Sequence, residues 1–295
     1  MALAIFLAVV LIMILISART LKRKPVFICK GDCIFSEILN EKRDIWIYLP
    51  KTEDDPELNK HQYPVVYLFD AEEQYAGFRE LMQKENGDGS KVFGDTIIVG
   101  IRNTNRSRDL TPTHSVLDSK GKKTRGFKPS GGGDKFIAFI HDELFPYIEA
   151  KYPVSSERIL MGHSLGGLTT INILLHHSEM FNGYIASDPS MWWDDKFMLN
   201  EARSILKKGG FDGKWLYFSI ANTTPPFTDI EHIHNDTSAK TNHVRSIFEL
   251  GDILQQTAGT GLHFSYKFYD QDDHNSVAMK TAYDGMQLLA KQPVN

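Results

Sequence analysis

The sequence predicts an α/β fold, in which a mostly parallel central sheet is flanked by helices. The first observation is that short apolar runs alternate with helical stretches from about residue 27 to the end, as in a sheet whose strands are connected by helices. The second is a glycine-rich turn between one apolar run and the helical stretch that follows it, at residues 162–167. The chain has 295 residues, 42% of them hydrophobic, which suits one domain with a sizeable core.

Several predicted strands are apolar throughout, as expected for strands buried on both faces. They lie at residues 45–49, 65–69, 97–101, 159–161, 184–186, 215–220 and 264–269. Helical periodicity predicts helices at residues 134–152, 165–177, 242–256 and 277–290. In the first of these, Pro146 is expected to bend or interrupt the helix. Two long polar segments, 103–133 and 223–241, are predicted loops, and loops of this length usually serve a site or are disordered.

The N-terminus carries an apolar run. Residues 2–18 contain no charged side chain, and basic residues follow between 19 and 24. A run of this length lies at the border between a signal peptide and a short membrane anchor. We therefore expect residues 1–24 to be a hydrophobic signal peptide or a membrane anchor, and residues 25–295 to be one domain. That domain would be exported to the periplasm or outside the cell, or attached to the membrane through the N-terminal segment.

Composition limits the partners. The formal net charge is −4 and no basic stripe stands out, which argues against a nucleic-acid partner. The two cysteines, Cys29 and Cys33, are either plain thiols or one small disulfide loop, and the latter needs an oxidising compartment. His232, His234 and His243 have no carboxylate at matching ligand spacing, so no metal site is predicted.

The glycine-rich turn fits the pattern G-x-S-x-G, from Gly162 to Gly166, with Ser164 at its centre. A nucleophile on a sharp strand-to-helix turn has a strained backbone, so its neighbours must be small. An apolar strand precedes this turn and an apolar helical stripe follows it, which is the context that the pattern needs. The sequence therefore predicts the α/β-hydrolase fold with Ser164 as nucleophile. The alternative is a turn that only lets a helix pack closely on a strand.

A serine hydroxyl needs a general base, since it is a weak nucleophile at its free pKa. In this fold the histidine follows the last strand. His274 lies just after the predicted strand 264–269 and before the final helix, so we predict it as the base. His163 adjoins the nucleophile, and we expect its side chain to point away from the serine oxygen.

The third member of a triad is harder to assign. An acid that orients the histidine is expected after the strand 215–220, but residues 221–226 contain no carboxylate. Asp236 and Asp229, which lie farther into the loop, are the preferred candidates, with Glu231 behind them. A Ser-His dyad without an acid is the alternative.

Two backbone amides are expected to form an oxyanion hole. One is the amide of Leu165, directly after the nucleophile, and the other belongs to Ala71 or Glu72 in the loop after the strand 65–69. Losing one such donor typically costs about 3 kcal/mol of transition-state binding.

Substrate-binding candidates lie near the predicted nucleophile. Trp192 and Trp193 follow the strand 184–186, so they belong at the same sheet edge as Ser164. There they would suit a flat or acyl substrate, or they are simply a core pair. Arg102 and its neighbours Arg106 and Arg108 would attract an anionic substrate.

Beyond these motifs, the sequence resembles a family of esterases related to esterase D, to the enterochelin and salmochelin esterases and to the mycolyltransferases. The resemblance covers nearly everything after the N-terminal run. It rests on the segments 65–70, 99–101, 108–112, 162–167, 187–193 and 274–277. The resemblance implies hydrolysis of carboxylic esters through an acyl-enzyme without a cofactor, with Ser164 and His274 as nucleophile and base. The sequence departs from the family at Thr224, where many members carry Asp or Glu.

The function predicted from these residues is a serine esterase that acts on a small-molecule ester, such as a siderophore lactone or an esterified sugar. One alternative is an acyltransferase with the same Ser-His machinery. Another is a non-catalytic binding protein on a hydrolase scaffold. The oligomeric state is not indicated by the sequence.

Overall fold

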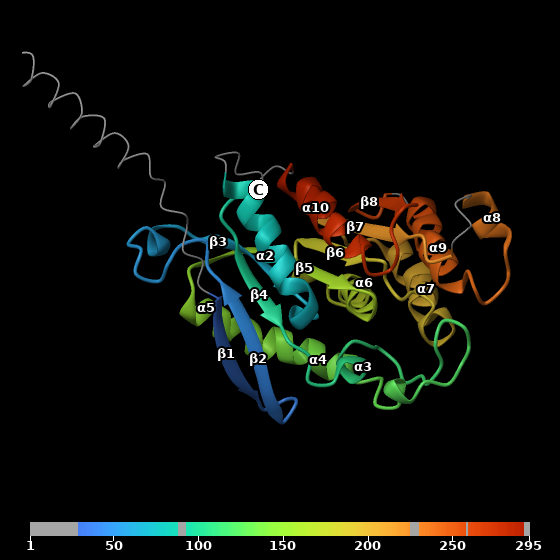
Figure 1. Ribbon diagram of the computed structural model, residues 1–295, viewed down its shortest axis with the longest axis horizontal. Helices are drawn as coiled ribbons and strands as arrows, with labels where there is room; N and C mark the ends of the chain where they lie inside the picture. The colour runs from blue at the N-terminus through green and yellow to red at the C-terminus, as the bar shows by residue number, and fades with distance from the viewer. Residues whose placement is uncertain (1–28, 88–92, 225–229, 258, 292–295) are drawn as a thin grey trace, which may run out of the picture.

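A computed structural model describes residues 29–87, 93–224, 230–257 and 259–291, and it contains one eight-stranded sheet in the order β1-β2-β4-β3-β5-β6-β7-β8. The strands from β3 to β8 run parallel to one another, whereas β2 is antiparallel to both of its neighbours, β1 and β4. The predicted, mostly parallel sheet is confirmed (Figure 1). The strands are β1 (Cys29–Ser36), β2 (Glu41–Tyr48), β3 (Tyr63–Leu68), β4 (Ile97–Ile101), β5 (Val154–His163), β6 (Gly183–Ser187), β7 (Lys214–Ala221) and β8 (Leu262–Tyr269).

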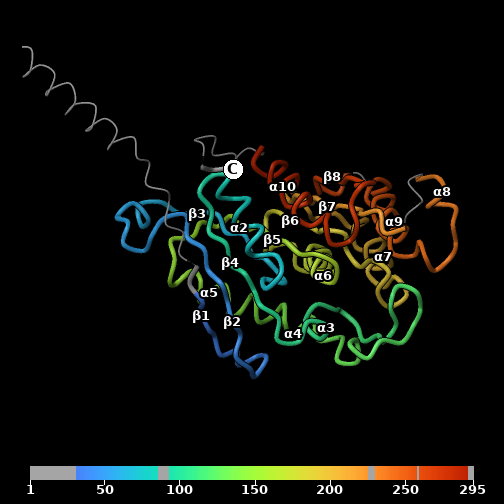
Figure 2. The backbone as a smooth tube through the Cα atoms, in the orientation of Figure 1, coloured from blue at the N-terminus to red at the C-terminus, as the bar shows by residue number. Residues whose placement is uncertain are grey.

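Helices cover both faces of the sheet. On one face α2 and α10 lie side by side, and α4, α5, α6, α7 and α9 pack on the other (Figure 1). In the backbone trace of Figure 2, the two edge strands, β1 and β8, lie at opposite ends of the sheet. The helices are α2 (Ala71–Gly87), α3 (Arg106–Asp109), α4 (Gly133–Phe139), α5 (Phe145–Lys151), α6 (Leu165–His176), α7 (Trp193–Ile205), α8 (Ile230–Asn235), α9 (Asn242–Gln256) and α10 (Val277–Ala290).

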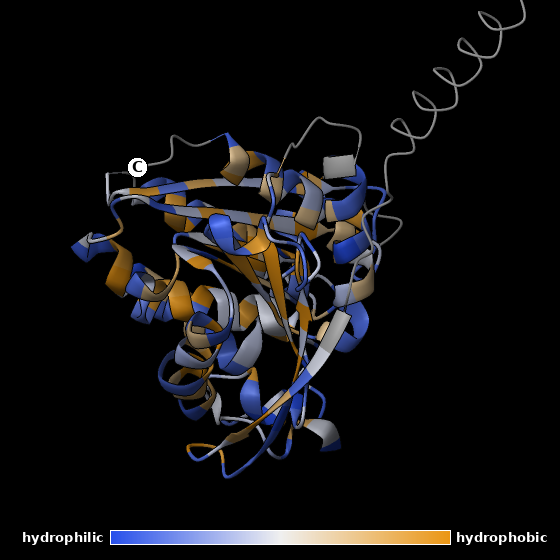
Figure 3. Ribbon diagram, turned by 90° about the vertical axis from the view of Figure 1, so that its left-hand side faces the viewer, coloured by the Kyte–Doolittle hydropathy of each residue, from blue (hydrophilic) through white to orange (hydrophobic). Residues whose placement is uncertain are grey.

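The core follows the alternation of each strand. In β3, Val65 and Tyr67 pack with the α4–α9 face, while Val66 and Leu68 pack with α2 and α10. All four side chains are at most 1% exposed, because a parallel strand between two helical layers has no solvent face. Figure 3 shows the hydrophobic colouring concentrated in the central strands.

The predicted helix 134–152 is interrupted, as Pro146 led us to expect. It consists of α4, one wider π-type turn at Ile140–Leu144, and α5, with Pro146 in the first turn of α5. Proline has no N–H to donate to the preceding turn, and the wider turn accommodates that missing hydrogen bond.

Several elements were not predicted from the sequence. The strand β1 is a polar edge strand that pairs with β2 alone, α7 lies in a segment for which the sequence predicts no element, and α8 lies within the predicted loop 223–241. The helix α2 is also polar overall, but Tyr75, Phe78 and Met82 are buried at helical spacing. That spacing was visible in the sequence.

The predicted signal peptide or anchor, residues 1–24, lies outside the described residues. Within the described ranges, no helix combines the length and the apolar character needed to cross a bilayer. Cys33 is a free, exposed thiol. Cys29 and Cys33 lie four residues apart in the same extended strand, about 13 Å from each other at ordinary strand rise, which is too far for a disulfide.

Candidate active site

Ser164 stands on a strained turn between β5 and α6. Its backbone has φ 60° and ψ −114°, a conformation that a residue with a side chain adopts only when its surroundings force it. A Cβ on Gly162 would lie 2.3 Å from the carbonyl oxygen of Gly166, so only glycine fits there. The Ser164 amide donates to the Ser187 carbonyl on β6 at 3.0 Å. The predicted strand-turn-helix around Ser164 is therefore present.

Ser164, His274 and Asp188 form one hydrogen-bonded chain. His274 Nε2 lies 3.0 Å from Ser164 Oγ, and its Nδ1 lies 2.5 Å from Asp188 Oδ2. His274 comes from the loop after β8, as the sequence predicted, and its side chain is 34% exposed. Asp188 is fully buried, and its Oδ1 accepts the Ala221 amide at 2.9 Å. This is the arrangement in which a histidine removes a proton from a serine while an acid holds the ring.

Asp188 occupies the position that the sequence analysis gave to Asp236 or Asp229, and the preference for Asp236 is wrong. The Asp236 carboxylate is engaged by Ser238, at 2.9 Å from its amide and 2.7 Å from its hydroxyl, whereas the oxygen facing His274 belongs to Asp188. Asp229 lies outside the described residues. The runner-up, Glu231, is in α8.

The acid was missed because it follows β6 rather than β7. In the β5–β6 register His163 pairs with Ser187, so Ser164 and Asp188 are the next residues on two neighbouring parallel strands. Pro189 follows directly and cannot continue the ladder. A carboxylate between a buried strand and a proline was the available indication, in a segment already noted for its resemblance to the esterases.

His163 supports the loop that carries His274. Its Nε2–H donates to the His274 carbonyl at 2.6 Å, and the two rings lie 4.5 Å apart. Burial, helped by the nearby His274, lowers the pKa of His163 to about 4. The Nε2 edge of the ring is directed at this carbonyl, and the ring is neutral at pH 7.

The depressed pKa of His163 makes stability depend on pH. The unfolded chain takes up the proton near pH 6.5 and the folded protein only near pH 4, so the neutral ring stabilises the fold above pH 6.5. That contribution, on the order of 3 kcal/mol, is lost as the pH falls from 6.5 to 4. Urea unfolding at pH 7 and pH 4.5 checks this. The free energy of unfolding should fall less between these pH values in His163→Gln, because glutamine keeps an N–H donor but cannot titrate. Equal falls in the variant and the wild type would contradict the role given to His163.

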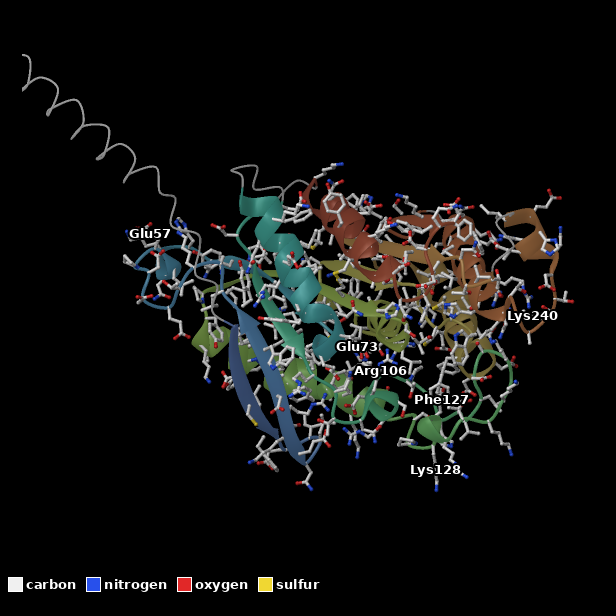
Figure 4. All side chains as sticks on the ribbon, in the orientation of Figure 1. Glu57, Glu73, Arg106, Phe127, Lys128 and Lys240 are labelled. Atoms are coloured by element: carbon white, nitrogen blue, oxygen red, sulfur yellow. The ribbon has the colours of Figure 1, made fainter. Side chains whose placement is uncertain are left out.

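A charged clamp holds the loop after β3 against the nucleophile turn. Asp70 is 1% exposed, with a left-handed φ of 53°. Arg106 binds both of its carboxylate oxygens, at 2.7 and 2.9 Å, and also lies 3.4 Å from the His163 carbonyl. Asn103 Nδ2 donates to Asp70 at 2.7 Å. Figure 4 shows Arg106 beside Glu73 at the start of α2.

The predicted oxyanion-hole residues lie at the starts of two helices. Leu165 is the first residue of α6, and Ala71 and Glu72 are the first two of α2. The opening amides of a helix have no acceptor within it, so both helices present N–H groups. The two ends are close together, because a Cβ on Gly166 would meet Asp70 Oδ2 at 3.3 Å.

The substrate-binding candidates separate in the structure. Trp193 is fully buried, and its Nε1–H donates to the Thr113 carbonyl at 3.2 Å, so it is a core residue and its predicted substrate contact is wrong. Trp192 is partly exposed, and its ring centroid lies 6.3 Å from that of Phe127. Arg102 binds Asp44 on β2 at 2.9 Å. It faces the neighbouring antiparallel strand rather than Ser164, so its predicted role is not supported.

The described residues include one further group at this site. Asp188, His274 and His243 bring potential metal-ligand atoms within 4.8 Å of one another. Both imidazole nitrogens lie at hydrogen-bond distance from the same Asp188 oxygen, 2.5 and 2.8 Å. These separations are direct N–H···O contacts. The sequence analysis names His243 only among residues of metal-ligand type and does not predict this contact.

Many families have a hydrogen-bonded Ser-His-Asp arrangement at the carboxyl edge of a parallel sheet. Comparison of the sequence with known families identifies the one to which this chain belongs. Residues 36–246 match the family Esterase, described as "Putative esterase". The chain belongs to this family. The match confirms the resemblance seen in the sequence, and solved structures with the α/β-hydrolase fold confirm the predicted fold class.

Relatives of this chain include proteins named for siderophores. Ferri-bacillibactin esterase BesA of Bacillus subtilis is 32% identical over 182 residues, which are 57% of this chain and 62% of that protein. The siderophore triacetylfusarinine C esterase of Aspergillus fumigatus is 29% identical over 174 residues, 55% of this chain and 56% of that protein. The chain thus spans little more than half the length of these relatives.

A solved structure covers more of the chain. The IroE-like serine hydrolase from Shewanella oneidensis is 33% identical, with a TM-score of 0.80, over 90% of this chain and 80% of that one. The siderophore hydrolase EstB from Aspergillus nidulans has a TM-score of 0.70 at 23% identity, over 90% of this chain and 96% of that one, and it supports the fold alone.

Proposed function

We propose that this protein is a serine esterase that hydrolyses a carboxylic ester through an acyl-enzyme. The observation that carries the proposal is the chain from Ser164 Oγ to His274 Nε2 at 3.0 Å and from His274 Nδ1 to the buried Asp188 carboxylate at 2.5 Å. Family membership and the names of the relatives support the same reaction.

The reaction would proceed in two steps. Ser164 Oγ attacks the ester carbonyl carbon while His274 Nε2 takes its proton, and that proton then passes to the alcohol as the ester bond breaks. Water next attacks the acyl carbonyl carbon while His274 Nε2 takes its proton, and the bond to Ser164 Oγ breaks as that proton passes to the serine oxygen and the carboxylic acid leaves. Asp188 holds the ring and stabilises its positive charge. The amides of Leu165 and of Ala71 or Glu72 would donate to the oxyanion in both steps.

We propose an anionic, siderophore-type ester as the substrate. The segment 120–128 exposes five basic side chains, those of Lys120, Lys122, Lys123, Arg125 and Lys128. Phe127 connects this segment to the partly exposed Trp192, which follows β6 as Asp188 does. Aromatic surface beside exposed cations suits a flat, negatively charged ester, and two relatives are named for siderophores.

Labelling by a fluorophosphonate probe tests the activity. Wild-type protein should take up one equivalent on the peptide that contains Ser164 and should hydrolyse p-nitrophenyl butyrate, whereas Ser164→Ala should do neither. A ferric catecholate triester should then be cleaved in preference to an uncharged ester of similar size. A wild-type protein that neither labels nor turns over would overturn the proposal.

The same probe tests location. We include in the proposal that residues 1–24 export the protein or attach it to a membrane, because residues 2–18 carry no charge. Cells that express the full chain should show the labelled band in the membrane or exported fraction. A shortened chain that starts at residue 25 should give a labelled band in the cytosol. The same distribution of the labelled band for the full and the shortened chain would contradict the proposed location.

A further inference from the structure

The carboxylate of Asp188 accepts a second imidazole, which a Ser-His-Asp triad does not require. His243 Nε2 lies 2.8 Å from Asp188 Oδ2, the oxygen that also faces His274 Nδ1. The two rings are 5.1 Å apart with planes at 88°, so they approach the oxygen in different orientations. His243 therefore acts on the acid without replacing His274.

His243 is held on a rigid support. It is the second residue of α9, and its carbonyl accepts the Ser246 hydroxyl at 2.7 Å. The next residue, Val244, is fully buried. Thr241, also fully buried, precedes the helix and donates to the Asp236 carbonyl at 3.2 Å. The ring thus approaches Asp188 from a packed helix and not from a free loop.

Asp188 needs such a partner because of where it stands. It has a left-handed φ of 40° although it is not glycine, and a buried carboxylate is stable only when donors surround it. Burial acts to raise the pKa of Asp188, but His243 and then His274 outweigh it and hold that pKa well below the usual range. The remaining donor to its oxygens in the described structure is the Ala221 amide.

We propose that His243 is a positioning residue for ester hydrolysis, whose Nε2–H fixes the Asp188 oxygen that serves His274. The inference rests on the esterase activity proposed above. Here an imidazole on α9 supplies one of the donors that hold the Asp188 carboxylate. Loss of this donor would let the carboxylate turn, so the His274 ring would spend less time aligned with Ser164.

Four variants test the donor against mere space filling. His243→Leu removes the N–H and keeps an apolar body. His243→Asn and His243→Gln both carry an amide N–H and differ by one methylene, and only Gln reaches the position of Nε2. We expect Leu and Asn to lower kcat by about 10- to 100-fold, the effect of losing a hydrogen bond to a charged group, with KM unchanged. Gln should recover most of kcat. In an Asp188→Asn background, His243→Leu should add no further loss.

Several results would overturn the inference. These are a wild-type kcat in His243→Leu, equal losses in Gln and Leu, a change confined to KM, or a full additional loss in the Asp188→Asn background. A readout independent of turnover is the downfield proton resonance of the His274–Asp188 hydrogen bond. It should shift in His243→Leu and stay in place in His243→Gln. An unmoved resonance in both variants would contradict the positioning role even in a protein without esterase activity, and failure of wild-type turnover alone would count against the proposed function only.

Discussion

Replacing Asp188 by Asn is expected to lower kcat by about 10⁴-fold with little change in KM. The amide has nearly the same shape as the carboxylate, so the Ala221 contact to Oδ1 survives. The change removes the negative charge and can place an N–H against His274 Nδ1, which favours the wrong tautomer of the ring. Steady-state kinetics with p-nitrophenyl butyrate measures the effect.

Asp236→Asn is the matched control, since it makes the same chemical change at the acid that the sequence favoured. Its carboxylate is engaged by Ser238, so we expect wild-type kcat. A large loss in Asp236→Asn together with a mild one in Asp188→Asn would return the role of the acid to the loop after β7.

Replacing Arg43 by Met is expected to lower the free energy of unfolding by about 1.5–3 kcal/mol, because it removes one of the two arginines that bind the buried Asp109 carboxylate and leaves only Arg108, 2.6 Å from Oδ1. Arg43 and Asp109 are both fully buried, and Arg43 Nη1 lies 2.6 Å from Asp109 Oδ2. Arg43 also donates to the Arg102 carbonyl at 3.0 Å and lies over the rings of Phe136 and Phe139. Methionine fills part of the space but donates no hydrogen bond to Asp109 Oδ2 or to the Arg102 carbonyl oxygen. Urea unfolding at pH 7 measures the loss.

The control for this change is Arg102→Met. Arg102 pairs with Asp44, but the two side chains are 38% and 55% exposed, and an exposed ion pair contributes less than about 1 kcal/mol. Similar losses of unfolding free energy in the two variants would show that the buried Arg43–Asp109 pair stabilises the fold no more than the exposed Arg102–Asp44 pair. Asp109 ends α3, the helix that begins with Arg106, so Arg43→Met should also loosen the clamp on Asp70 and reduce turnover at temperatures where the fold persists.

Local sequence rules predicted that Ser164 and His274 meet, because each belongs to one place in the fold. The turn at Ser164 needs glycine at 162, and the base follows the last strand, so two short segments suffice. The acid is expected between Ser164 and His274 in the chain, and it can follow either β6 or β7. No local pattern tells which of these strand ends faces His274, and Asp188 becomes visible only when the neighbouring strands are aligned.

Two other features lay beyond periodicity. The pattern of α9 predicts a buried face but not that His243, near its start, meets a carboxylate 55 residues earlier in the chain. Trp192 and Trp193 are adjacent, and yet one is partly exposed while the other is buried against Phe127 and Thr113. Neighbours on a turn point in different directions, and composition alone assigns them the same role.

The position of the acid has an evolutionary consequence. Ser164 and Asp188 take their separation from the hydrogen-bonded register of β5 and β6, two neighbouring strands inside the sheet. The segment between β7 and α9 supplies neither of them. Insertions, deletions and sequence drift there leave unchanged the strand register that sets the distance between Ser164 and Asp188. A lineage with this arrangement can therefore vary that segment in length and sequence without separating Ser164 from Asp188.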